Sequence, residues 1–168
     1  MAETTILTEL AKLVPVLLGG LLAIGGGLAS QIVVHRLSGR RDLAKLRRDR
    51  IEALVKAIYA HDQWIQAKQT TMIFRNEDHD APSPLDEARM LQALHLPELA
   101  KEVLAIQQAQ IPLLEFINAE RIKHMKNKEE FVKGWDSAPF DDAYKQYIAA
   151  INALVDKCRQ LLLSIGES

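Results

Sequence analysis

The stretch FDDAYKQYIAAINALVDKCRQLLLSI, Phe140–Ile165, decides the fold class of this chain. Its apolar residues recur at alternating steps of four and three positions, which places them on one face of a single helix. We call this face the seam, and it consists of Phe140, Tyr144, Tyr147, Ile151, Leu154, Cys158, Leu161 and Ile165. A helix with one continuous apolar face needs other helices to cover it, so the seam predicts antiparallel bundle packing or a coiled-coil contact.

The sequence before the seam predicts further helices of the same bundle. These expected helices cover about residues 42–74, 84–95 and 98–133. The polar segment Arg75–Pro84 separates the first two, Ser83 is an N-cap candidate for the second, and Pro112 predicts a kink in the third. No stretch alternates β-branched and polar residues as a strand would. We therefore expect an all-α fold in which residues 51–168 form a small antiparallel bundle of about four helices.

A long uncharged stretch lies near the N-terminus, Leu13–Val34, with the sequence LVPVLLGGLLAIGGGLASQIVV. As a helix these 22 residues would reach about 33 Å, which is enough to cross a hydrocarbon core of about 30 Å. A cleaved signal peptide and a buried core helix are the alternatives. A signal peptide has a shorter apolar region after a basic start, and a core helix of this length usually has a polar face. We predict a single transmembrane helix at residues 13–35.

The distribution of charge predicts how this helix is oriented. The net charge is only −1, but residues 36–50 hold seven basic residues against two acidic ones, and residues 51–168 are net acidic. The basic residues are Arg36, Arg40, Arg41, Lys45, Arg47, Arg48 and Arg50. Because basic residues beside a span mark its cytoplasmic side, we expect residues 1–12 outside and the bundle inside the cell (inner) membrane. The same side chains could contact anionic lipids, whereas nucleic acid is disfavoured because no aromatic residue is interleaved among them.

Small residues recur on one face of the predicted span. Gly19, Ala23 and Gly27 lie four residues apart, and Gly26 and Ser30 form a second pair with the same spacing. This arrangement lets two membrane helices approach closely. It does not distinguish self-association from packing against another membrane subunit.

The candidates for chemistry are isolated residues rather than motifs. The cluster Glu77–Asp80 lacks the glycine and distal glutamate of a calcium loop, and His61 beside Asp62 has no nucleophile motif with it. Glu120 and His124 share a helix face and are expected to form a surface hydrogen bond. The single cysteine, Cys158, lies on the seam and is expected to be a buried, unreactive thiol. We expect no enzyme, cofactor, metal or small-molecule substrate.

Two function classes remain. The first is a membrane-anchored interaction protein, which holds its cytoplasmic bundle at the membrane to recruit or assemble partners, or serves as an accessory subunit of a membrane complex. The alternative is an oligomeric membrane effector or channel subunit gated by its bundle, although a pore-lining face would usually carry polar residues along its length. The expected partners are membrane lipids and a protein, either a second copy or another subunit. No motif is specific enough to name a family.

Overall fold

The computed structural model describes residue 39 and residues 41–166. The chain divides into two compact units, Met1–Lys45 and Leu46–Ser168, and the contacts described below belong to the second. Every regular element within residues 41–166 is helical, which confirms the all-α class. After a first helix at residues 41–69, the elements are η1 (Thr70–Phe74), α2 (Leu85–His95), η2 (Pro97–Leu99), α3 (Ala100–Ala109), α4 (Ile111–Lys126), α5 (Lys128–Lys133) and α6 (Ala138–Gly166).

Several helix boundaries follow directly from the local sequence. Pro112 stands in the first turn of α4, and the break between α3 and α4 falls at Gln110, where the kink was predicted. Before α6, the Asp136 carboxylate accepts a hydrogen bond from the backbone N–H of Ala138. Ser83 Oγ accepts one from the N–H of Leu85 at the start of α2. These polar side chains satisfy backbone groups that a helix end leaves unpaired.

One boundary was not predicted. The expected helix at residues 98–133 is interrupted at Asn127, whose backbone is extended and whose side chain accepts hydrogen bonds from the N–H groups of Glu129 and Glu130. Asn127 therefore ends α4 and caps α5. The expectation of about four helices was too low, because this one segment contains α3, α4 and α5.

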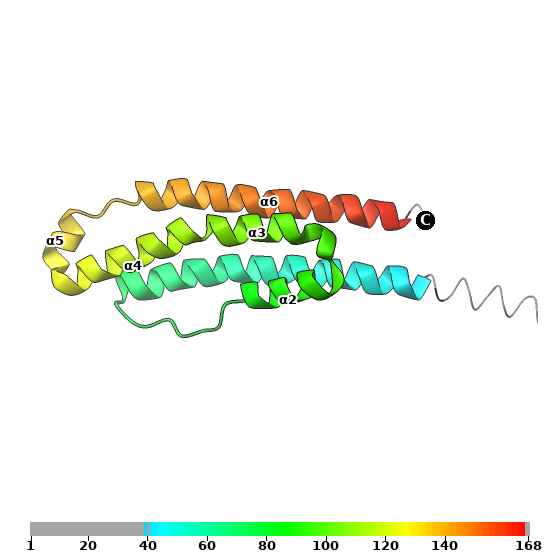
Figure 1. Ribbon diagram of the computed structural model, residues 1–168. Helices are drawn as coiled ribbons and strands as arrows, with labels where there is room; N and C mark the ends of the chain where they lie inside the picture. The colour runs from blue at the N-terminus through cyan, green and yellow to red at the C-terminus, as the bar shows by residue number, and fades with distance from the viewer. Residues whose placement is uncertain (1–38, 40, 167–168) are drawn as a thin grey trace, which may run out of the picture. The chain divides into compact units, whose positions relative to one another are not determined.

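The helices of the second unit pack side by side (Figure 1). The two helices α3 and α4 form one bent rod, and α6 runs back along it after the turn made by α5. The shorter α2 runs antiparallel to α3, to which the short turn of η2 connects it. Consecutive rods are thus antiparallel, as the short connections predict.

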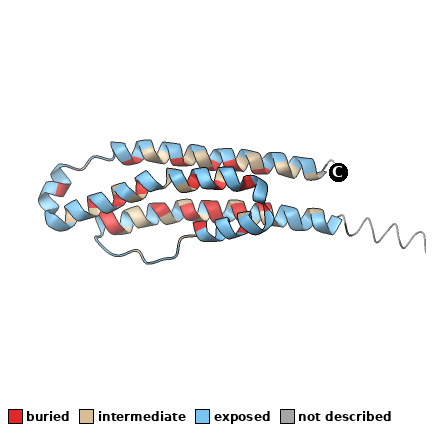
Figure 2. Ribbon diagram, in the orientation of Figure 1, coloured by how far each residue is buried: buried red, intermediate tan, exposed pale blue. Residues whose placement is uncertain are grey.

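Buried residues, coloured red in Figure 2, occur on every rod of the bundle. On α6 the buried members of the seam are Phe140, Tyr147, Ile151, Leu154 and Cys158, while Tyr144, Leu161 and Ile165 are half-buried. The seam is therefore the face of α6 that packs against the bent rod of α3 and α4. The bundle has one continuous core, to which the first helix, η1 and the later helices all contribute.

The predicted transmembrane helix at residues 13–35 lies outside the described residues, as do Gly19, Ala23, Gly26, Gly27 and Ser30. Among the helices within residues 41–166, none combines the length and the apolar character needed to cross a membrane.

Candidate functional site: the His61 cluster and the exposed apolar face

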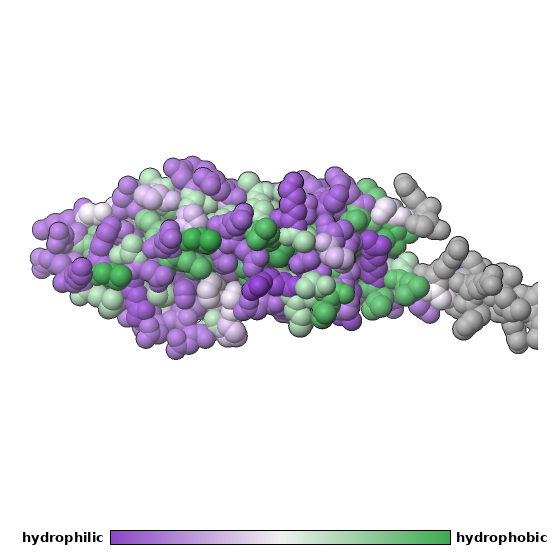
Figure 3. Space-filling view, in the orientation of Figure 1, coloured by the Kyte–Doolittle hydropathy of each residue, from purple (hydrophilic) through white to green (hydrophobic). Residues whose placement is uncertain are grey.

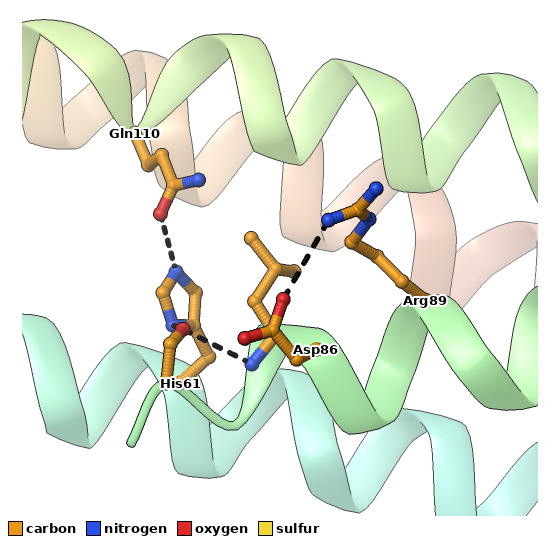
Figure 4. Close-up of polar contacts among 6 residues, drawn as sticks. His61, Asp86, Arg89 and Gln110 are labelled. Atoms are coloured by element: carbon orange, nitrogen blue, oxygen red, sulfur yellow. Dashed lines mark hydrogen bonds and ion pairs between the residues drawn. The ribbon is translucent and has the colours of Figure 1, made fainter. Parts of the chain in front are cut away.

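The most unusual residue of the core is His61, whose side chain is completely buried. It occupies a position of the apolar stripe on the first helix, between Ile58 and Ile65, so the helix carries its ring inward. Its Nε2 lies 3.0 Å from Gln110 Oε1, and its Nδ1 lies 3.2 Å from Ser83 Oγ (Figure 4). Since an amide oxygen only accepts, Nε2 carries the proton and the Ser83 hydroxyl donates to Nδ1. This geometry corresponds to a neutral imidazole with both nitrogens satisfied.

Aromatic rings enclose the same imidazole. Trp64 stacks on it with ring centroids 5.4 Å apart, and Tyr147 of α6 meets it edge-on at 6.0 Å. Burial lowers the pKa of His61, because the charged form loses its hydration there. The hydrogen bond to Gln110 and the charges of Asp62 and Asp86 act in the opposite direction but are smaller effects.

Residues 75–84, which we call the strap, connect η1 to α2 and pass over this cluster. None of these ten side chains is buried, so polar contacts hold the strap in place. The indole N–H of Trp64 donates to the carbonyl of Ala81 at 2.8 Å, and Asp78 forms an ion pair with Arg121 of α4 at 2.8 Å. Ser83 adds its bond to His61. The strap is thus tied to the first helix and to α4 through a few side chains.

The order Ser83–His61–Gln110 resembles a hydroxyl, a base and an amide that orients the base, which invites comparison with hydrolases. Two observations argue against that chemistry. His61 has no solvent exposure, and the Ser83 oxygen also accepts the N–H of Leu85 at the start of α2. The two pockets described on this bundle, on the α4–α5 hairpin and between α2 and α3, include none of the three residues. The cluster is therefore suited to holding the strap rather than to binding a substrate.

The other sequence candidates for chemistry are separated in the structure. Glu77–Asp80 lies in the strap, and within the described part of the chain no three metal-ligating side chains converge. The expected hydrogen bond between Glu120 and His124 is wrong. Glu120 is buried and pairs with Lys123, whereas His124 donates from Nδ1 to the carbonyl of Ile73 at 2.6 Å. The reason is that η1 and α5 cover this face of α4, so neither residue is on an open helix surface.

Cys158 lies within the seam and is 2% exposed. Burial, together with the charge of Glu102, raises the pKa of its thiol to about 11. A thiol in such a setting is a weak nucleophile, because the thiolate is the reactive form.

The basic residues near the start of the bundle fall into two groups. Arg36 and Arg40 lie outside the described residues, while Arg41, Lys45, Arg47 and Arg48 are exposed on the first helix and Arg50 is half-buried. Arg47 pairs with Glu98 of η2 at 2.6 Å, an interaction that ties this helix to the turn before α3. The other exposed basic side chains of the group remain turned to solvent.

Four exposed apolar side chains on α3 and α4, which we call the exposed apolar face, were not identified from the sequence. They are about half exposed, namely Leu104, Ile111, Ile122 and Met125, and on α2 Met90 and Leu94 are exposed as well. The four on α3 and α4 fall on positions spaced by threes and fours, away from the buried Leu113 and Ile117, whereas the buried Val103 lies beside Leu104. Between α2 and α3, Met90, Val103 and Leu104 line a shallow groove. In the space-filling view apolar patches alternate with polar side chains along the visible face of the bundle (Figure 3).

The sequence did contain the signal for this face. The spacing of Leu104, Ile111, Ile122 and Met125 is helical, but it runs beside the stronger buried pattern of the same segment. Periodicity identifies an apolar face without saying whether another helix covers it.

Comparison with family models, curated protein sequences and solved structures gives no match to this chain. Its function is therefore argued from its own residues.

Proposed function

We propose that this chain is a membrane-anchored helical interaction protein. In this proposal residues 13–35 cross the cell (inner) membrane once, residues 1–12 lie outside, and the bundle faces the cytoplasm. There the bundle recruits or assembles protein partners, or joins a larger membrane complex as an accessory subunit.

One observation carries the proposal, namely the direct succession of an uncharged stretch of 22 residues and a segment with seven basic residues. Such a stretch matches the thickness of the hydrocarbon core, and the basic residues favour the cytoplasmic side. Arg41, Lys45 and Arg48 are exposed on the first helix, which supports a contact with anionic lipid headgroups.

The exposed apolar face supports the interaction part of the proposal. Single exposed leucines are common, but several apolar side chains aligned along two consecutive helices are typical of protein contact surfaces. The alignment of Leu104, Ile111, Ile122 and Met125 would suit a helix from a partner or from a second copy.

Photo-cross-linking tests this proposal in intact cells. A photoreactive amino acid replaces Ile122 on the exposed apolar face, and a matched chain carries it at Gln146, which is exposed on α6. We expect a discrete adduct with one protein, or with a second copy, from position 122 and a weaker or absent adduct from position 146. Equal, diffuse labelling at both positions, with no stoichiometric protein co-purifying, would contradict an interaction role.

A further inference from the structure

The strap and His61 together suggest a conformational device that does not depend on membrane attachment. We propose that the strap at residues 75–84 is an acid-released clasp, held closed by neutral His61 and opened locally when that imidazole takes up a proton. The rest of the bundle remains folded during this change.

The closed clasp requires a neutral ring. Nε2–H donates to Gln110 Oε1, so Nδ1 has a free lone pair only while the imidazole is uncharged, and the Ser83 hydroxyl donates to it. A proton on Nδ1 turns this acceptor into a donor. Ser83 Oγ already accepts from the N–H of Leu85, so the hydroxyl would have to accept twice and find a new acceptor for its own proton.

Two carboxylates, Asp62 and Asp86, favour an imidazolium at this site, but their effect is smaller than that of burial, and no hydrogen bond within the described residues joins either of them to the ring. Asp62 is adjacent on the same helix, but one of its oxygens accepts from Tyr144 at 2.8 Å and the other from Gln66 at 3.0 Å. On α2, Asp86 forms an ion pair with Arg89 at 3.6 Å (Figure 4). Besides Ser83 and Trp64, the ring is faced by Gln110 before α4 and Tyr147 on α6, and none of these four side chains carries a charge at neutral pH. A protonated His61 would therefore need water, which the closed clasp excludes.

One ammonium group and one further imidazole lie beside Trp64, the neighbour of His61. The Lys68 ammonium lies 4.9 Å from the centroid of the indole, and the ring of His79 in the strap meets the indole edge-on at 5.7 Å. The Nε2 atom of His79 is shielded from solvent and has no hydrogen-bond partner within residues 41–166. Positive charge on His61 would thus add to a region that already holds one ammonium and a second ionisable ring.

Opening the strap is the least costly way to admit water. Its side chains are exposed or half-buried, so its release gives up polar contacts but little apolar burial. By contrast, the elements beneath it carry completely buried residues such as Ile58, Ile65 and Leu113. Protonation of His61 is favoured in the open state, because there the ring regains its hydration and its ordinary pKa of 6.5.

Acrylamide quenching of Trp64 tests the clasp in the full-length chain. Trp64 becomes the single tryptophan when Trp135 is replaced by Phe. We expect the quenching constant to rise at least about two-fold between pH 7.5 and pH 5.0, while the far-UV circular dichroism stays unchanged. An unchanged quenching constant, or its rise together with loss of helix, would overturn the proposal.

Two variants assign the effect to a residue. His61→Gln keeps a side chain that forms hydrogen bonds but does not titrate in this range, so the acid response should disappear. His79→Gln is the matched control and should keep the response, because the His79 ring contacts Trp64 but its Nε2 forms no hydrogen bond with the described residues. Loss of the response in His79→Gln and its persistence in His61→Gln would place the effect at the wrong histidine and refute the proposal.

Ser83→Ala tests the strap's contribution to the hydrogen bond with His61, and it does not change the helix that carries His61. Without the hydroxyl the clasp lacks its bond to Nδ1, so Trp64 should already be accessible at pH 7.5 and respond little to acid. Quenching equal to that of the parent chain at both pH values would show that Ser83 does not hold the strap.

Discussion

The buried hydroxyl of Tyr147 is expected to lower the stability of the folded bundle. It belongs to a residue with no solvent exposure, and none of the described residues forms a hydrogen bond with it. Leaving a buried hydroxyl unpaired costs about 1–3 kcal/mol relative to its hydrated state. Tyr147→Phe removes that penalty and keeps the ring that packs against His61 and Tyr144. We therefore expect Tyr147→Phe to stabilise the bundle by about 1 kcal/mol, or to raise Tm by about 4 °C.

Tyr144 on the same helix provides a matched control with the opposite sign. Its hydroxyl donates to Asp62 at 2.8 Å and accepts from Gln66 at 2.9 Å. Burial and the bond to Asp62 raise the pKa of this phenol to about 12. The identical change, Tyr144→Phe, removes both bonds and should destabilise the bundle by about 1 kcal/mol.

Urea unfolding of the full-length chain in one mild detergent, followed by circular dichroism at 222 nm, measures both effects. The account predicts a higher midpoint for Tyr147→Phe and a lower midpoint for Tyr144→Phe, with equal m-values. A loss of 1 kcal/mol or more in Tyr147→Phe would contradict this expectation, since it would show that the hydroxyl is paired in the folded protein.

Three further predictions concern other parts of the bundle. Burial lowers the pKa of His61 in the folded chain, so as the pH falls the unfolded chain takes up this proton first, near pH 6.5. The free energy of unfolding should therefore fall as the pH drops below 6.5. In a stability profile measured from pH 7.5 to 5, His61→Gln should reduce this fall. Asn127→Ala removes the side-chain oxygen that caps α5 and should lower the free energy of unfolding, measured by thermal unfolding, by about 1 kcal/mol. A change within about 0.2 kcal/mol of zero would contradict the role of the cap. Cys158, with its pKa raised to about 11, should react with an aromatic disulfide at pH 8 only at the rate of global unfolding; reaction as fast as that of a free thiol would show that the seam is open.

Helix positions could be predicted from the sequence because they depend on local signals. The 4/3 spacing of the seam, Pro112 and the polar strap each predict a boundary or a face, and the structure has helices and breaks at those places. Asn127 was missed because a single asparagine among charged residues gives no periodic signal. Its effect depends on two backbone N–H groups that become available only when α4 ends there.

The candidate site could not be predicted in the same way. In the sequence, His61 is a polar residue that interrupts an apolar stripe. Its partners Ser83 and Gln110 are 22 and 49 residues away along the chain. The packing of α2 and α4 around the first helix brings these residues together, and no sequence motif predicts this arrangement. The exposed apolar face was missed for a related reason: the sequence shows which residues share a helix face, but only the packed bundle shows which faces stay uncovered.

Membrane attachment and its orientation are the central claim, and one experiment tests both. Cells expressing the full chain with a reporter fused after Ser168 are fractionated, the membranes are extracted with alkaline carbonate, and the compartment in which the reporter is active is determined. We expect the chain to stay in the carbonate-resistant membrane pellet and the reporter to be active only on the cytoplasmic side. Recovery of the chain in the carbonate supernatant, or reporter activity only on the outer side, would contradict it.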